Sequence, residues 1–131
     1  MAFSKQQRIE IYSKFNGKCA YCGAEIQLKD MQIDHIIPQR NFIQNVHNKF
    51  RIPEFLNYLT ELDLNHNDNL HPACRICNKW KSDFDLEFFR RELSEQVNRL
   101  NSYSTNYRIA KKYSQIQETI KPIRFFFENE P

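Results

Sequence analysis

The amino-acid sequence predicts one small α+β domain, in which a helix precedes a core with short strands and a mainly helical extension follows. Three observations predict this fold class. The chain has 131 residues, the size of a single domain. Its four cysteines form two Cys-x-x-Cys pairs, at 19/22 and 74/77, on both sides of a short strand-forming run. After the second pair, apolar residues recur at helical spacing. We therefore expect a core over about residues 16–83 and an extension over 84–131.

The first elements follow from local sequence signals. A helix is predicted over Ser4–Phe15, because its first residue is a suitable cap and apolar residues fall near one face. Asn16 and Gly17 end it, since both tolerate the left-handed conformation found at helix C-termini. A short strand is predicted over Met31–Ile37, where Pro38 stops it.

The second half of the chain is predicted to be mainly helical. Residues 41–65 predict two short helices, and a long helix begins at Ser82 or Asp83, either of which is a suitable cap. The apolar stripe of this long helix, which predicts core packing, consists of Leu86, Phe89, Leu93, Val97 and Leu100. Thr105–Gln117 is predicted to be helical as well. Apolar and polar residues alternate in Pro122–Glu128, which predicts a closing strand.

The two cysteine pairs predict a structural zinc site. The ligands would be Cys19, Cys22, Cys74 and Cys77. Paired thiols in a chain without an export signal favour a metal over disulfides. Two such turns complete a tetrahedral Zn²⁺ shell with Zn–S distances of ~2.3 Å, and a shell of four thiolates has no open position for catalysis. A redox-active pair and two disulfides are the alternatives, although neither turn lies in the βαβ context of a thioredoxin-like site.

Composition and charge restrict the function. Only 2 glycines are present, which excludes the glycine-rich phosphate loops of nucleotide-binding proteins. No apolar run is long enough to span a bilayer, and the first residues lack a secretory signal, so we expect a cytoplasmic protein without membrane contacts. The net charge is +3, and residues 73–112 carry nine Lys and Arg against five acidic residues. A polyanion would be expected to dock there.

Polar motifs flank the cysteine pairs in a distinctive order. After the first pair comes Asp-His-Ile-Ile-Pro at 34–38, then Asn-Leu at 69–70, then Cys-Arg-Ile-Cys-Asn-Lys-Trp-Lys at 74–81. In this order the sequence resembles the HNH endonucleases whose ββα-metal motif is clamped by a four-cysteine zinc. The resemblance covers about half of the chain, from Cys19 to about Ser82, and its last signature position is Asn78 in place of histidine.

The resemblance implies a role for each motif residue. His35 is expected to be the general base that takes a proton from water. Asp34 and Asn78 are expected to hold a catalytic divalent cation, Mg²⁺ or Mn²⁺, and Asn69 to hold the loop opposite the base in place. Histidine titrates near neutral pH, and hard cations prefer oxygen ligands. Adjacent residues of a regular strand point to opposite faces, so the strand would have to end or bulge between Asp34 and His35.

DNA is the partner that the resemblance implies. Arg75, Lys79 and Lys81 lie near the start of a predicted helix and are expected to contact phosphates. One site cuts one strand, so a double-strand cut would need a homodimer or two successive visits. Standalone chains of this type are expected to be bacterial or phage-encoded. The alternatives are a non-catalytic zinc-knuckle module that binds nucleic acid and a nuclease that acts on RNA.

Overall fold

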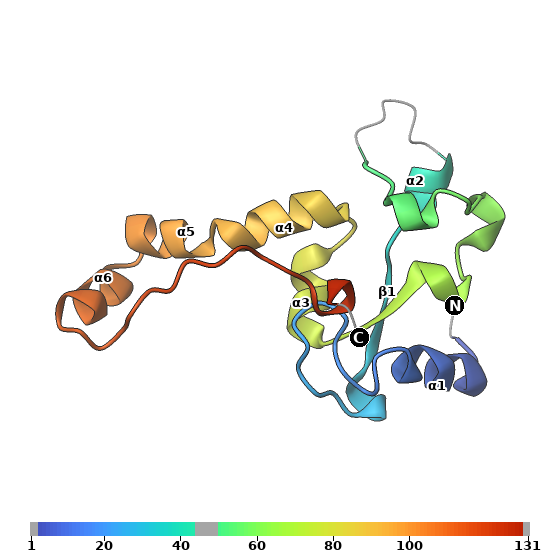
Figure 1. The fold of residues 1–131 in the computed structure, drawn as a ribbon, viewed down its shortest axis with the longest axis horizontal. Helices are drawn as coiled ribbons and strands as arrows, with labels where there is room; N and C mark the ends of the chain where they lie inside the picture. Colours follow the sequence, from blue (N-terminus) through green and yellow to red (C-terminus); the bar gives the residue numbers. More distant parts are fainter. Residues whose placement is uncertain (1–2, 44–49, 130–131) are drawn as a thin grey trace.

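Two short strands and one helix form the centre of the fold. In the computed structural model, which describes residues 3–43 and 50–129, β1 (Gln32–His35) pairs antiparallel with β2 (Leu70–Ala73). The register aligns Gln32 with Ala73 and His35 with Leu70. Helix α3 (Arg75–Lys81) follows β2 directly and packs on β1 (Figure 1). The result is a ββα unit in which a long connection, residues 36–69, separates the two strands.

The remaining elements are helical. The other α-helices are α1 (Lys5–Ser13), α2 (Gln39–Ile43), α4 (Leu86–Ser94), α5 (Gln96–Tyr103) and α6 (Thr105–Lys112). Short 3-10 turns occur at Leu28–Asp30, Glu54–Leu56, Glu61–Asp63, Asn67–Asn69 and Phe126–Glu128. Helices with one small antiparallel sheet confirm the predicted α+β class. Where two helices are predicted in 41–65, the structure has the end of α2 and the two 3-10 turns Glu54–Leu56 and Glu61–Asp63, while residues 44–49 lie outside the described residues.

Helix α1 forms where its sequence predicts it. The Ser4 hydroxyl accepts a hydrogen bond from the Gln7 backbone N–H at 3.0 Å, which caps the first turn. At the other end, Asn16 and Gly17 have positive φ angles of 56° and 80°. Ile11 is fully buried and fastens α1 to the centre of the fold.

The main core is aromatic and is completed by the C-terminal end of the chain. The Phe125 ring stacks on Phe89 with centroids 5.3 Å apart and meets the Tyr21 ring edge-on at the same distance. All three side chains are buried. In Figure 1 the segment that ends in the 3-10 turn Phe126–Glu128, drawn in red, returns from the far end of the molecule to the core.

The predicted closing strand over Pro122–Glu128 is wrong. The described part of this segment contains no strand and ends in the 3-10 turn Phe126–Glu128. Its backbone N–H groups at Phe126 and Phe127 donate to the carbonyls of Tyr21 and Ala20, at 2.9 and 2.8 Å. The alternation of apolar residues therefore reflects packing against an irregular turn, since that turn offers no strand edge for ladder pairing.

The prediction of one long helix after the second cysteine pair is also wrong, because this segment forms two helices, α4 and α5. Helix α4 begins later than predicted, at Leu86, and the chain bends at Glu95 before α5. Ser82 has a φ of 51° and ends α3, whereas the Asp85 carboxylate caps α4 by accepting from the Phe88 N–H at 2.8 Å. Only the first part of the apolar stripe is buried, because α5 leaves the core and Leu100 is 42% exposed.

Helices α5 and α6 form an arm that projects away from the core (Figure 1). Neither helix contains a buried residue. The Glu118 carboxylate holds the arm together by accepting hydrogen bonds from Asn101, Tyr107 and Lys111 at 2.7–3.0 Å. Helix α6 ends at Lys112, so it is shorter than the predicted Thr105–Gln117 helix.

The cap of α4 gives the first testable prediction. We expect Asp85→Ala to lower the free energy of unfolding by about 2 kcal/mol, because it removes a buried helix cap. The same carboxylate also pairs with Arg51 at 3.1 Å. Asp83→Ala is the matched control: its side chain is 39% exposed and pairs with Arg40, so its loss should cost less than about 1 kcal/mol. Urea unfolding measures both values, and equal losses would contradict the assignment of the cap.

Candidate functional site

The first Cys-x-x-Cys turn is a tight knuckle. An antiparallel bridge between Lys18 and Glu25 closes its base. The Cys19 N–H donates to Ala24 O at 2.8 Å, and the Gly23 N–H donates to Cys19 O at 3.0 Å. Gly23 has a φ of +77°, and a Cβ there would come within 2.8 Å of the Phe126 ring. The turn therefore requires glycine at this position.

The second turn is the start of α3. Cys74 is the N-cap residue, and its sulfur accepts a hydrogen bond from the Cys77 N–H at 3.5 Å. A helix N-terminus carries a partial positive charge, which favours thiolates beside it. Cys74 therefore both caps α3 and places its sulfur beside the cysteines of the first knuckle.

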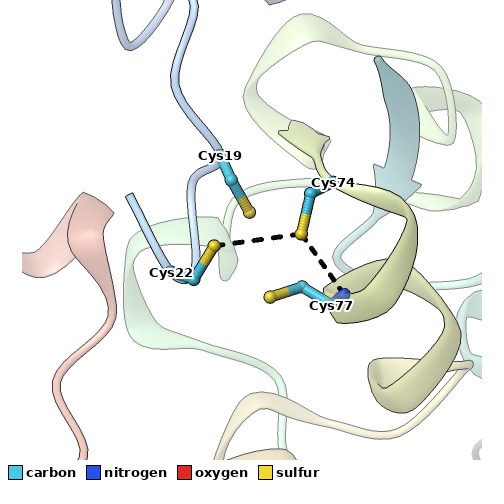
Figure 2. A group of neighbouring side chains, drawn as sticks. All are labelled: Cys19, Cys22, Cys74 and Cys77. Carbon is cyan, nitrogen blue, oxygen red and sulfur yellow. Dashed lines mark hydrogen bonds between the residues drawn. The ribbon is translucent and has the colours of Figure 1, made fainter. Parts of the chain in front are cut away.

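The four sulfurs converge on one point between the two turns. All four Sγ atoms lie within 4.8 Å of one another, and those of Cys22 and Cys74 are 3.8 Å apart (Figure 2). A tetrahedral zinc with Zn–S bonds of ~2.3 Å needs sulfurs separated by about 3.8 Å. All four cysteines are free thiols. The cluster is therefore compatible with structural zinc, as the sequence predicts, and the two-disulfide alternative is not formed.

The pKa values of Cys19, Cys22 and Cys77 shift in different directions. The side-chain hydrogen bond with Cys77 lowers the pKa of Cys19 to about 4, and the same bond raises the pKa of Cys77. Burial is the main cause that raises the pKa of Cys22. Without a metal, negative charge would thus concentrate on one sulfur. A bound Zn²⁺ would let the neighbouring thiols ionise too, because thiolates are its ligands.

Asn69 fastens the chain after β1 to the chain before β2. The residue is fully buried. Its Oδ1 accepts from the Ile37 N–H at 2.8 Å, while its Nδ2 donates to Ile37 O and to Leu64 O, both at 2.9 Å. Two of these bonds fix Ile37, in the loop that leaves β1 after His35, and the third binds Leu64 in the segment before β2.

His35 lies at the end of β1, half-buried. Its Nε2 is 2.8 Å from Asn65 Oδ1, and its ring lies 5.8 Å from that of Phe3. An amide oxygen can only accept a hydrogen bond, so this contact assigns the proton to Nε2. The other ring nitrogen, Nδ1, has no hydrogen-bond partner among the residues that the structure describes.

Asp34 points to the opposite face of β1 and is buried, with only 3% exposure. The Lys81 ammonium lies 3.2 Å from each of its carboxylate oxygens, and the Tyr21 hydroxyl donates to Oδ2. The ladder from 32 to 35 is regular, so no bulge turns Asp34 and His35 to the same side. Lys81 is fully buried. The expectation that Lys81 contacts DNA is therefore corrected, because its ammonium is buried and pairs with Asp34 inside the protein.

Burial is the largest cause of the pKa shifts of Asp34, Tyr21 and His71. It raises the pKa of Asp34, although the Lys81 charge and the Tyr21 hydrogen bond oppose the shift. Burial and the nearby carboxylate raise the pKa of Tyr21 well above its usual range, so the hydroxyl keeps its proton and donates. Burial lowers the pKa of His71 well below its usual range, and the imidazole is neutral.

Asn78 lies on the same side of β1 as Asp34. Its Nδ2 donates to Gln32 Oε1 at 2.7 Å. The divalent cation expected between Asp34 and Asn78 does not fit this arrangement, because Lys81 and Tyr21 already occupy the carboxylate oxygens. The described side chains therefore do not form that cation site.

The outer face of α3 is basic and partly aromatic. Arg75 and Lys79 lie there, as expected for phosphate contacts. Ile76 and Trp80 accompany them, 70% and 59% exposed. This face consists of side chains that can contact both the phosphates and the bases of a nucleic acid.

Several residues around the site carry no recognisable signal in the sequence. Asn65 lies in the long connection between the strands and meets His35 only because the 3-10 turn Asn67–Asn69 returns the chain to β2. Tyr21 is one of the two middle residues of the first knuckle, where the motif allows any residue type. A lysine three residues after Asn78 belongs to the quoted motif, but its inward direction depends on the packing of α3 on β1.

Comparisons with known proteins add little. No profile of a protein family matches the chain, and no curated protein matches it in sequence. Among solved structures, it is similar to the crystal structure of the Type II-C Cas9 enzyme from Actinomyces naeslundii, with a TM-score of 0.47 and 19% sequence identity. The match covers 85% of this chain and 12% of that one, so the chain spans a small part of that protein's length.

No helix in the described ranges is long and apolar enough to cross a membrane.

The cysteine cluster predicts one zinc per chain. Metal analysis of the purified protein should give this ratio, and removal of the metal by a chelator should abolish cooperative thermal unfolding, because bound zinc contributes on the order of 10 kcal/mol to domains of this type. Zinc should also dissociate as the pH falls, since protons compete for the thiolates. Cys77→Ser should lose the metal. His66→Ala, which removes an exposed imidazole outside the cluster, should keep it. Stoichiometric disulfides without metal would contradict the assignment.

Proposed function

We propose that this protein is a zinc-stabilised endonuclease that hydrolyses phosphodiester bonds of DNA, with His35 as the general base. The observation that carries the proposal is the position of the His35 imidazole, at the end of the first strand of a ββα unit whose helix begins at the cysteine cluster. The resemblance to HNH endonucleases rests on the same residues.

The contacts of His35 suit proton abstraction. With the Nε2 proton bound to Asn65, Nδ1 carries the lone pair that can accept a proton from water. Histidine is the side chain whose ordinary pKa allows this near neutral pH. Two hydrogen bonds between Asn69 and Ile37 hold the loop that follows His35, which would limit the movement of the imidazole. A positioned base of this type contributes about 10²–10⁴-fold to a rate.

A divalent cation, Mg²⁺ or Mn²⁺, belongs to the proposal through the resemblance alone. Such an ion would stabilise negative charge on the phosphoryl oxygens. The pairing of Asp34 with Lys81 speaks against its assignment to Asp34 and Asn78, and the proposed role of His35 does not depend on that pair. A homodimer likewise stays a prediction.

The exposed face of α3 is the proposed contact with DNA. Arg75 and Lys79 would bind phosphates, and Trp80 offers a stacking surface. They lie on a helix that packs against the strand bearing His35. Lys81 has no part in this contact.

One observation favours a second candidate, a non-catalytic zinc-knuckle module that binds nucleic acid. The Asp34 carboxylate is paired with Lys81, so the described site has no open carboxylate for a cation. Such a module would use the same face of α3 and would leave His35 without a chemical role.

A plasmid assay separates the two candidates. Supercoiled plasmid incubated with the wild-type protein and Mg²⁺ or Mn²⁺ should be nicked or linearised. We expect His35→Ala to slow this reaction by about 10²–10⁴-fold while it keeps zinc and fold. Asn57→Ala is the control, since it removes an exposed side chain of the long connection and leaves Asn65 and the turn beside it unchanged.

The possible outcomes of this assay have distinct meanings. A mobility shift without cleavage would favour the binding module. Equal rates in wild type and His35→Ala would remove His35 as the base. Parallel digests of DNA and RNA identify the substrate, and cleavage of RNA alone would replace DNA in the proposal.

Asn65 gives a second test of the same geometry. Asn65→Ala removes the acceptor of the His35 Nε2 proton, and loss of one hydrogen bond should slow cleavage by about tenfold. Asn57→Ala, an exposed asparagine of the same connection, is the control and should cleave at the wild-type rate. A wild-type rate in Asn65→Ala would show that the tautomer of His35 does not depend on this contact.

A further inference from the structure

A buried polar network surrounds Asp34. The side chains of Asp34, Tyr21 and Lys81 are each at most 3% exposed. The Lys81 Nζ lies 3.2 Å from both carboxylate oxygens, and the Tyr21 hydroxyl donates to one of them. We propose that Asp34 is a positioning residue, which Lys81 and Tyr21 use to fix the strand bearing His35 relative to the cysteine cluster, and that it is not a ligand of a catalytic cation. The part of this inference that concerns catalysis rests on the proposed function.

The network connects both halves of the cluster to β1. Tyr21 lies between Cys19 and Cys22 in the first knuckle. Lys81 is the last residue of α3, the helix that begins after Cys74. The two side chains therefore reach the same carboxylate from different sides of the cluster, so a displacement of either turn would be transmitted to Asp34.

A further bond links the network to the chain at His35 itself. The Lys81 Nζ donates to the backbone carbonyl of His35 at 3.2 Å, in addition to its contact with Asp34. Asn69 fixes Ile37, two residues further on. The backbone around the imidazole is thus held on the inner side by Lys81 and beyond the strand by Asn69.

The described surroundings of Asp34 already satisfy the carboxylate without a metal. The groups facing it are the Lys81 ammonium and the Tyr21 hydroxyl. The next group is His71, its cross-strand partner, whose Nδ1 lies 3.0 Å from the Tyr21 oxygen. A buried carboxylate that is neutralised by a buried ammonium already has its counter-charge. A cation bound at Asp34 would have to displace Lys81 and separate its buried ammonium from that counter-charge.

Charge-neutral replacement distinguishes a positioning residue from a ligand. In the full chain, Lys81→Met leaves a buried carboxylate unpaired and Asp34→Asn leaves a buried ammonium unpaired. Each should lower the melting temperature by about 10 °C or more. The double variant Asp34→Asn/Lys81→Met removes both charges, and the amide oxygen introduced at position 34 can still accept from Tyr21. Its melting temperature should recover to within about 5 °C of wild type, with one zinc per chain.

Cleavage by the double variant is the deciding measurement. If Asp34 only positions the strand, the double variant should cut plasmid within about tenfold of wild type. The Mn²⁺ concentration for half-maximal rate should change by less than about threefold. Recovery of fold and zinc together with loss of cleavage, or with a large rise in the required Mn²⁺, would overturn the inference and make Asp34 a ligand.

Tyr21→Phe provides a milder variant that should fold. It should keep zinc, slow cleavage by about tenfold and leave the Mn²⁺ requirement unchanged. Tyr12→Phe is the matched control, because it removes a hydroxyl that donates to Ile26 O in the other core cluster and should cleave at the wild-type rate. Equal rates in the two variants would contradict a positioning role for Tyr21.

Failure of the proposed function would be recognised separately. A wild-type protein that cuts no nucleic acid under any metal condition removes the catalytic part alone. The melting temperatures of the two single variants and the double variant still test the ion pair. If their losses simply add, the two charges do not interact, and the network is refuted independently of activity.

Discussion

The convergence of four cysteine sulfurs is the constraint on which the rest of the structure depends. The two turns that supply them are separated by the whole length of β1, the long connection and β2. Four thiols in so small a volume oppose one another when they ionise, so the arrangement is stable only with a cation or with most of the protons retained. A chain of this size has limited apolar surface to bury. The turns also hold the aromatic core, since Tyr21 contacts Phe89 and Phe125.

Strand β1 carries both a buried structural residue, Asp34, and the proposed general base, His35. Asp34 and His35 are adjacent, and a regular ladder sends them to opposite faces. The inner residue meets Lys81 and becomes part of the interior, whereas the outer one meets Asn65 and keeps Nδ1 unbonded within the described part of the chain. The sequence predicts that Asp34 and His35 belong to one catalytic site. In the structure the two side chains lie in separate environments, one inside the protein and one at its surface. Lys81 links the two, because its ammonium contacts both the Asp34 carboxylate and the backbone carbonyl of His35.

Much of the scaffold can be predicted from local signals, and the remainder depends on contacts between distant segments. The cap at Ser4, the turn at Asn16 and Gly17 and the cysteine pairs act over a few residues, so the sequence predicts them. It does not predict the division of the long helix, because an unbroken apolar stripe is compatible with one helix or two.

The buried contacts of the site are hidden from the sequence for a related reason. A lysine in a basic stretch is normally solvated, and only the packing of α3 on β1 buries Lys81 against Asp34. Asn65 carries no signal, since its contact with His35 follows from the path of a long connection. Motif spacing thus identifies which residues matter, whereas the direction in which each side chain points depends on tertiary packing.

The position of Lys81 bears on how the interior of the ββα unit is held together. The Lys81 ammonium neutralises the buried Asp34 carboxylate, so this carboxylate needs no bound metal as its counter-charge. Strand β1 would therefore keep its position without a catalytic metal. In the proposed nuclease, Lys81 and Asn69 would hold the backbone around His35 together with the zinc-binding turns, and a divalent ion would be needed only where the phosphate binds. The charge inside the ββα unit and the charge on the DNA would thus be balanced by separate cations, one supplied by the chain and one by the solvent.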